Sequence, residues 1–108
     1  MNIQQGSVSK NFWENGDDTA KNHQVEVVFP RAFSERPYVM LTLERAEIGQ
    51  FIEESTYKTD KNHILHTVNR VDISANNITP TGFNICVATW GSNIIYGYRI
   101  AWTAIAEE

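Results

Sequence analysis

The sequence predicts an all-β fold, in the form of a six-stranded antiparallel β-sandwich. Several stretches alternate apolar and polar residues, which is the pattern of a strand with one buried face. No stretch repeats its apolar residues at the 3.6-residue spacing of an amphipathic helix. Gly, Asn, Thr and Pro interrupt the chain at short intervals, as turns between strands do. With 108 residues, 42% of them hydrophobic, the chain is long enough for a single domain over residues 1–108.

The strands of the N-terminal half can be placed in order. Residues 15–18 (Asn-Gly-Asp-Asp) predict a turn, because these residue types tolerate a left-handed or side-chain-bonded backbone. Residues 23–29 alternate apolar with polar side chains and predict a strand, which Pro30 closes because proline cannot donate to a strand ladder. A further apolar run at 38–43 predicts the next strand, and Gly49 is expected to end that run.

The C-terminal part, residues 70–105, is expected to form three consecutive strands joined by short turns. A strand that resumes at residue 64 ends at Ser74, before a cluster of turn residues at 76–82. The strand at 83–90 alternates, with Phe83, Ile85 and Val87 on one face and Asn84, Cys86, Ala88 and Trp90 on the other. The last strand, 94–105, follows the turn at 91–93.

The last strand carries large side chains on both faces. Its alternation predicts Tyr96, Tyr98, Ile100 and Trp102 on one face, and Ile95 and Ile105 with Arg99 on the other. One of these faces is expected to pack the core. The large side chains on the other face are those that an interface between subunits would cover. Trp90 at the rim and Tyr96 just past the turn are expected to bring two aromatic faces close together, and a binding site is predicted there.

Composition narrows the classes of function. The net charge is −4 and the nine Lys and Arg are scattered, so we expect no nucleic-acid partner. No run approaches the roughly 20 apolar residues of a membrane span, so no membrane insertion is expected. The start of the chain does not look like a signal peptide, which leaves a cytoplasmic or unconventionally secreted protein, or a mature extracellular form. The single cysteine, Cys86, is expected to be a small buried hydrophobe.

The segment 78–83 (Ile-Thr-Pro-Thr-Gly-Phe), followed by Trp90, by Tyr96 and by residues 100–102 (Ile-Ala-Trp), resembles the H-type lectin domain. That family includes snail agglutinins and the C-terminal module of slime-mould discoidins. The F-x3-F-x3-P-x-V pattern from Phe29 to Val39 resembles it as well. The resemblance also implies a first strand at 6–13, anchored by Phe12 or Trp13, and an extended loop or extra hairpin at 50–63.

The resemblance implies a lectin that binds terminal N-acetylgalactosamine or galactose on glycans and acts in agglutination or cell adhesion. It implies a homotrimer or a dimer of trimers (a hexamer). In such sites an aromatic face stacks on the sugar ring, and a guanidinium or carboxylate bonds to vicinal hydroxyls. The family's sugar-binding positions correspond to Gly16, Asp18, Arg70, Trp90, Gly91 and Tyr96. Snail lectins have a sugar-contacting histidine where this chain has Gly91, which leaves open the balance between the two sugars.

Other interpretations remain. Trp90 is also compatible with the edge of the core, Tyr96 with an interface, Arg70 with a surface ion pair and Asp18 with turn chemistry. An oligomeric adhesion or assembly module that has lost sugar binding is therefore the alternative function. A hydrolase is disfavoured because the chain has no G-x-S-x-G nucleophile motif and no glycine-rich phosphate loop. We expect no enzymatic activity, no cofactor and no metal site.

Overall fold

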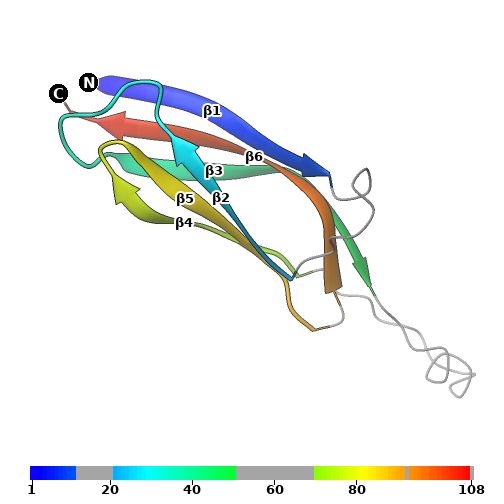
Figure 1. Ribbon diagram of the computed structural model, residues 1–108. Helices are drawn as coiled ribbons and strands as arrows, with labels where there is room; N and C mark the ends of the chain where they lie inside the picture. The colour runs from blue at the N-terminus through cyan, green and yellow to red at the C-terminus, as the bar shows by residue number, and fades with distance from the viewer. Residues whose placement is uncertain (12–20, 51–69, 92, 108) are drawn as a thin grey trace, which may run out of the picture.

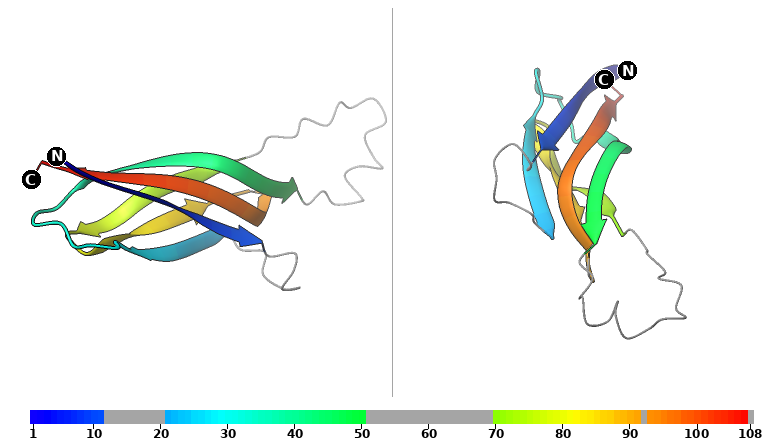
Figure 2. Two further views of the ribbon diagram at one scale, coloured as in Figure 1. Left: turned by 90° about the horizontal axis from the view of Figure 1, so that it is seen from above. Right: turned by 90° about the vertical axis from the view of Figure 1, so that its right-hand side faces the viewer.

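A computed structural model describes residues 1–11, 21–50, 70–91 and 93–107. Within these ranges every regular element is a strand, which confirms the all-β prediction. The six strands form two antiparallel three-stranded sheets, sheet A in the order β1-β6-β3 and sheet B in the order β2-β5-β4. The two sheets pack face to face as the layers of a sandwich, with both chain termini at one end (Figures 1 and 2).

The strands follow the predicted order, but their ends differ from the prediction. Their bounds are β1 Asn2–Asn11, β2 Asn22–Val28, β3 Tyr38–Gln50, β4 Asp72–Thr79, β5 Gly82–Ala88 and β6 Asn93–Ala106. The prediction that Gly49 ends the third strand is wrong, because β3 continues through it. The turn expected from residue 76 is also placed too early, since β4 runs on to Thr79 with an irregular register after Asn76. The predicted turn at 15–18, the anchor at Phe12 or Trp13, most of the 50–63 insertion and the strand start at 64 lie outside the described residues.

The core lies between the sheets and follows the two-residue period of β5 and β6. Phe83, Ile85 and Val87 are buried, as the alternation predicts, and they face side chains of β6 that are also buried. A cluster of aromatic rings closes the core at the end near the chain termini. Its members, Phe29, Phe33, Phe83 and Trp102, contact one another at ring-centroid distances of 5.0–5.7 Å.

Trp102 fits into the core because its neighbour across the sheet is a glycine. Gly6 on β1 is paired with Trp102 on β6. A β-carbon at Gly6 would lie 2.6 Å from Cζ2 of the indole, well inside van der Waals contact. The absence of a side chain at Gly6 therefore makes room for the largest side chain of the core.

A β-bulge changes the predicted faces of β6. Glu47 pairs with Gly97 and Ile48 pairs with Ile95, so Tyr96 is an extra residue of β6 between these two consecutive pairs. The alternation therefore shifts by one residue at this point, and Ile95 and Tyr98 both face the core. The prediction that Tyr96 shares a face with Tyr98, and Ile95 a face with Arg99, is wrong. Alternation along a strand cannot reveal an inserted residue when both neighbours are large and apolar.

Cys86 also differs from its predicted environment. It lies on the outer face of sheet B and is half-buried, because the inward-facing positions of β5 are the odd-numbered ones. Asn76 Nδ2 on β4 lies 3.0 Å from its Sγ atom. The sulfur therefore belongs to a polar sheet surface and not to the core.

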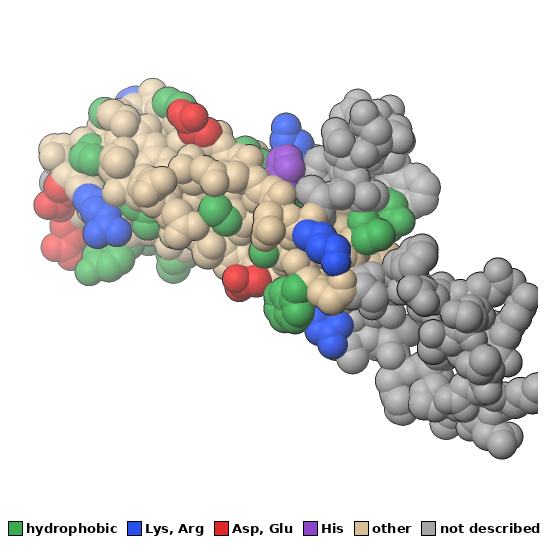
Figure 3. Space-filling view, turned by 60° about the horizontal axis from the view of Figure 1, so that its bottom comes forward, with side chains coloured by type: hydrophobic (Ala, Val, Ile, Leu, Met, Phe, Trp, Pro, Cys, Tyr) green, Lys and Arg blue, Asp and Glu red, His purple; other side chains and the backbone are tan. Residues whose placement is uncertain are grey.

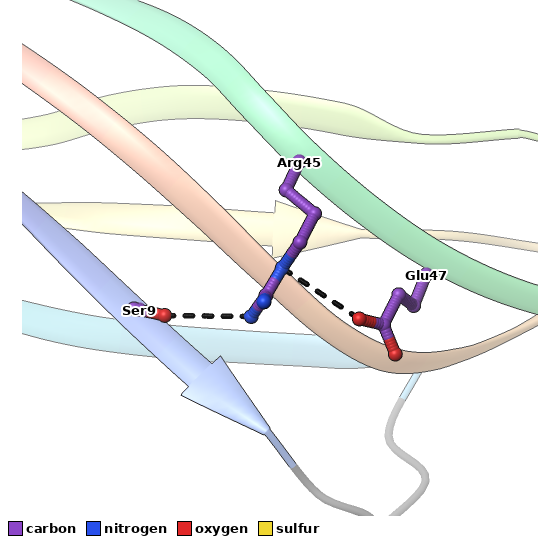
Figure 4. Close-up of polar contacts among 3 residues, drawn as sticks. All are labelled: Ser9, Arg45 and Glu47. Carbon is purple, nitrogen blue, oxygen red and sulfur yellow. Dashed lines mark hydrogen bonds and ion pairs between the residues drawn. The ribbon is translucent and has the colours of Figure 1, made fainter.

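The outer face of sheet A has a charged end and an apolar end. At the charged end, Arg45 on β3 reaches across β6, lying 3.6 Å from Glu47 Oε1 and 3.4 Å from Ser9 Oγ on β1 (Figure 4). Arg99 pairs with Glu44 at 3.3 Å. At the apolar end, near the chain termini, the exposed side chains of β1 and β3 flank β6. They are Ile3, Tyr38 and Met40.

Candidate functional site

The predicted site residues that can be placed gather at one end of the sandwich, where β5 leads into β6; we call this end the rim. Trp90 follows the end of β5 and is 51% exposed, which is unusual for so large an apolar side chain. The alternation predicted Trp90 on one face of the strand at 83–90. In the structure β5 ends at Ala88, so Trp90 lies beyond the strand. Gly91, the next residue, has a φ of +71°, a left-handed conformation that favours glycine.

Arg70 lies directly beside the Gly91 backbone. A β-carbon built at Gly91 would be 3.3 Å from Arg70 Nη1, so the guanidinium occupies the space that a side chain at this position would need. The hydroxyl of Thr89 donates to the carbonyl oxygen of Arg70 and ties the start of β4 to the end of β5. The structure thus brings together Arg70, Trp90 and Gly91, three of the residues that the sequence predicted.

Three further residues hold the rim in place, and sequence reasoning missed them. Lys21 Nζ donates to the carbonyl oxygen of Gly91. The backbone N–H of Thr89 donates to the Lys21 carbonyl oxygen at 2.8 Å. Asn93, which is fully buried, donates from Nδ2 to the carbonyl oxygen of Trp90 at 3.1 Å. Only Asn93 had a sequence signal, as part of the predicted turn; Lys21 and Thr89 are recognisable only from contacts between strands.

The remaining predicted residues are placed differently. Tyr96 lies at the same end of the sandwich, but its ring covers the backbone of Gly49 on β3, where a β-carbon would come within 2.3 Å of Tyr96 Cε2. The structure thus places Tyr96 against Gly49 of sheet A, at the end of the sandwich that carries Trp90. Gly16 and Asp18 lie outside the described residues.

A polar pair joins the two sheets just inside the rim. His23 Nδ1 on β2 and the Tyr98 hydroxyl on β6 are 2.7 Å apart. Burial raises the pKa of Tyr98 to about 12. Burial, and secondly the positive charge of Lys10, lowers the pKa of His23 below its ordinary value of 6.5. His23 is therefore neutral in the folded protein at neutral pH.

This shift predicts a loss of stability in acid. Because the His23 pKa is lower in the folded state, the unfolded state takes up the proton first, and the free energy of unfolding falls as the pH drops below about 6.5. We expect the melting temperature of the wild-type protein to fall more steeply between pH 7.5 and pH 5, roughly, than that of His23→Gln. Parallel curves for the two proteins would show that His23 does not contribute.

The chemistry of the rim suits recognition. It offers the half-exposed indole of Trp90 and, beside the backbone of the next residue, the guanidinium of Arg70. Among the described residues no group of three or more His, Cys, Asp or Glu is arranged to hold a metal ion. Such a surface can stack on an apolar ring face while it donates paired hydrogen bonds to adjacent oxygens.

The sequence profile of the H-type lectin domain matches residues 24–105. The chain belongs to the H-type lectin domain family. The match covers the residues described at the rim except Lys21 and His23. This H-type lectin domain also has the fold of discoidin II from Dictyostelium discoideum, with a TM-score of 0.71 and 22% sequence identity. The superposition covers 99% of this chain and 37% of that one.

This H-type lectin domain is also similar to two further proteins. A protein of Fuscovulum blasticum, named for open reading frame 7 of its ATP synthase subunits region, is 33% identical over 87 residues, which are 81% of this chain. The chain spans 63% of the length of that protein. The R1-type pyocin tail fibre shares the fold with a TM-score of 0.56 and 20% identity, covering 97% of this chain and 70% of the fibre chain.

The family match supports a carbohydrate-binding domain and points to a binding module in place of an enzyme. Within the described residues the structure contains no helix that is long and apolar enough to cross a membrane.

Proposed function

We propose that this lectin binds terminal N-acetylgalactosamine or galactose on glycans, at the rim, and that it does so as an oligomer. The observation that supports this best is that the half-exposed Trp90 is followed directly by Gly91, whose backbone lies beside the guanidinium of Arg70. Gly16, Asp18 and Tyr96 complete the proposed site, since they match the family's sugar-binding positions. We expect no catalytic activity.

Each rim residue has a distinct task in the proposed complex. The indole of Trp90 stacks on the apolar C–H face of the sugar ring. The guanidinium of Arg70 donates two parallel hydrogen bonds to vicinal hydroxyls, which a lysine could serve only as a point charge. Lys21 and Asn93 hold the carbonyl oxygens of Gly91 and Trp90, so the loop does not have to be ordered when the sugar binds.

Gly91 suggests that the site discriminates little between the two sugars. It has no side chain to contact an N-acetyl group, and the neighbouring guanidinium fills the space beside its backbone. We therefore expect galactose and N-acetylgalactosamine to bind with similar affinity. A shallow site of this kind binds a single sugar weakly, and several sites on one oligomer then supply avidity.

The test is a glycan array on the purified protein, followed by calorimetry with the free sugars. Arg70→Ala should weaken binding by about 1.5–3 kcal/mol, which is roughly 10- to 100-fold, because a hydrogen bond to a charged group is lost. Arg31→Ala, which removes an exposed arginine away from the rim, is the matched control and should bind as the wild type does.

Two outcomes would contradict this assignment. Unchanged binding in both Arg70→Ala and Trp90→Ala would place the sugar elsewhere on the molecule. A blank array from a folded oligomer would favour the alternative function, an adhesion or assembly module that has lost sugar binding.

The apolar end of the outer face of sheet A supports the proposed oligomer, a trimer or a dimer of trimers. Ile3 and Tyr38 flank Ile105 across three strands, and Tyr38 is 84% exposed. Met40 extends the same surface. A second copy that covers these side chains would remove a contiguous apolar area from water.

We expect Met40→Glu to dissociate the oligomer, because a carboxylate would be buried at the interface without a partner. Sedimentation velocity should then show monomers in place of trimers or hexamers. Val28→Glu places the same charge at an exposed apolar position of sheet B and should leave the assembly intact. An oligomer that persists in Met40→Glu but dissociates in Val28→Glu would show that the interface lies on sheet B.

A further inference from the structure

The outer face of sheet B contains a hollow that lies far from the rim. It has a volume of about 280 Å3 and lies where β4 turns into β5, at the end of the sandwich near the chain termini. Its polar lining comes from three strands and the turn, through Glu26, Asn77, Thr79, Thr81 and Asn84. β5 runs from the hollow toward the rim, and the five residue steps from Phe83 to Ala88, at about 3.3 Å each, separate the two by roughly 17 Å.

The hollow is produced by an irregularity in sheet B. Asn76 pairs with Asn84 and Thr79 pairs with Gly82, so two residues of β4 stand opposite one residue of β5. Asn77, one of the two, has a φ of +53°, which asparagine tolerates better than most residues. Such bulges bend a strand and redirect its side chains, and this one adds the Asn77 side chain to the lining.

The turn that borders the hollow is held rigidly by its own side chains. Thr79 Oγ1 accepts hydrogen bonds from the backbone N–H groups of Thr81 and Gly82, each at 3.2 Å. The hydroxyls of Thr79 and Thr81 are also 3.2 Å apart. A ligand would therefore meet a preformed edge and would not have to order the turn.

The lining chemistry favours a neutral ligand with many hydroxyl groups. Glu26 and Asn84 are directly opposite each other on β2 and β5, so a carboxylate and an amide face the same space. Within the described part of the chain, Glu26 has no ion-pair partner and no Lys or Arg lines the hollow, which disfavours anions. On the face of the molecule drawn in Figure 3, acidic and basic side chains are scattered and form no large patch of one sign.

One apolar side chain completes the set of contacts. Val28, which is 69% exposed, lines the hollow beside the polar groups. A pyranose ring needs this combination, since it presents hydroxyls at its edge and C–H groups on its face. The volume lies just below the range of about 300–1,000 Å3 that is typical of small-molecule sites, so the space suits one ring.

We propose that this hollow is a second carbohydrate site, which takes a single neutral pyranose ring by hydrogen bonds to Glu26, Asn84 and the turn hydroxyls. It is independent of the rim, because the two places share no residue. A lectin with both sites would hold one glycan at two points or two glycans at opposite ends of the sandwich.

The test is an NMR titration that follows backbone amides in the Trp90→Ala protein, in which the rim lacks its stacking face. The probes are methyl glycosides of galactose, glucose, mannose and N-acetylglucosamine, each at about 20 mM, well above a millimolar Kd. At least one glycoside is expected to shift the amides of residues 26–28 and 77–84. Glucuronic acid, which is anionic, is expected to leave them in place.

Two variants and one control make the result decisive. In the same background Asn84→Ala should weaken the titration by up to about tenfold, because it removes a hydrogen-bonding amide. Glu26→Gln should weaken it as well, because a neutral amide oxygen replaces the charged carboxylate as acceptor. Asn76→Ala removes an amide from the same sheet face that does not line the hollow, and should titrate like its parent. Should Asn84→Ala fail to fold, Glu26→Gln serves alone.

The proposal is overturned if no glycoside shifts these amides, or if the shifts persist unchanged in both Asn84→Ala and Glu26→Gln. Shifts that appear at the rim of the wild-type protein and nowhere in Trp90→Ala would support the rim site while overturning this one. The failure of either site is therefore visible separately from that of the other.

Discussion

Replacing Trp102 with alanine is expected to lower the free energy of unfolding by about 3–5 kcal/mol, the usual range for removing a buried aromatic side chain. Trp102 is only 6% exposed and contacts the rings of Phe29 and Phe83, each at a centroid distance of 5.7 Å. No side chain at Gly6 can fill the space, so a cavity would remain. Thermal unfolding should therefore shift downward by at least about 12 °C for a domain of this size.

Trp90→Ala is the matched control, because it removes the same side chain from an exposed position. It should change the free energy of unfolding by about 0.5 kcal/mol or less, the usual size of a surface effect, while it weakens sugar binding. The two tryptophans thus separate stability from recognition. Equal losses of stability in the two variants would contradict the packing described for Trp102.

Replacing Gly82 with alanine is expected to destabilise the protein by about 1–3 kcal/mol, toward the upper end of the range for overpacking. A β-carbon at Gly82 would lie 2.3 Å from the carbonyl oxygen of Val27, a backbone atom that cannot rotate away. Gly82 is in the central strand of sheet B, paired on both sides with Val28 and Thr79. The ends of β2 and β5 would have to separate.

Chemical denaturation with urea measures this effect. Thr42→Ala, at an exposed position of β3 on the outer face of sheet A, is the control and should change the midpoint little. A Gly82→Ala protein as stable as the Thr42→Ala protein would mean that β2 and β5 do not approach as closely as the structure shows.

The amino-acid sequence alone was sufficient for the fold class, and it named three of the residues that lie at the rim, Arg70, Trp90 and Gly91. The period of two along β5 separates Phe83, Ile85 and Val87 from the outer residues, and the structure confirms that these three are buried. The motif around residues 78–83, with Trp90 and Tyr96, indicated the family that the profile match then confirmed. These features are local, because alternation and turn chemistry depend on neighbours within a few residues.

Tertiary structure decided the rest. The bulge at Tyr96 depends on how β6 aligns with β3, so no pattern within β6 alone reveals it. The convergence of Lys21, Arg70 and Thr89 at the rim joins the ends of three strands that are distant in sequence. The hollow beside the β4–β5 turn likewise arises from the mismatch between two strands. The pattern along a strand determines which residues face inward, whereas the register between strands determines which residues meet, and only folding establishes that register.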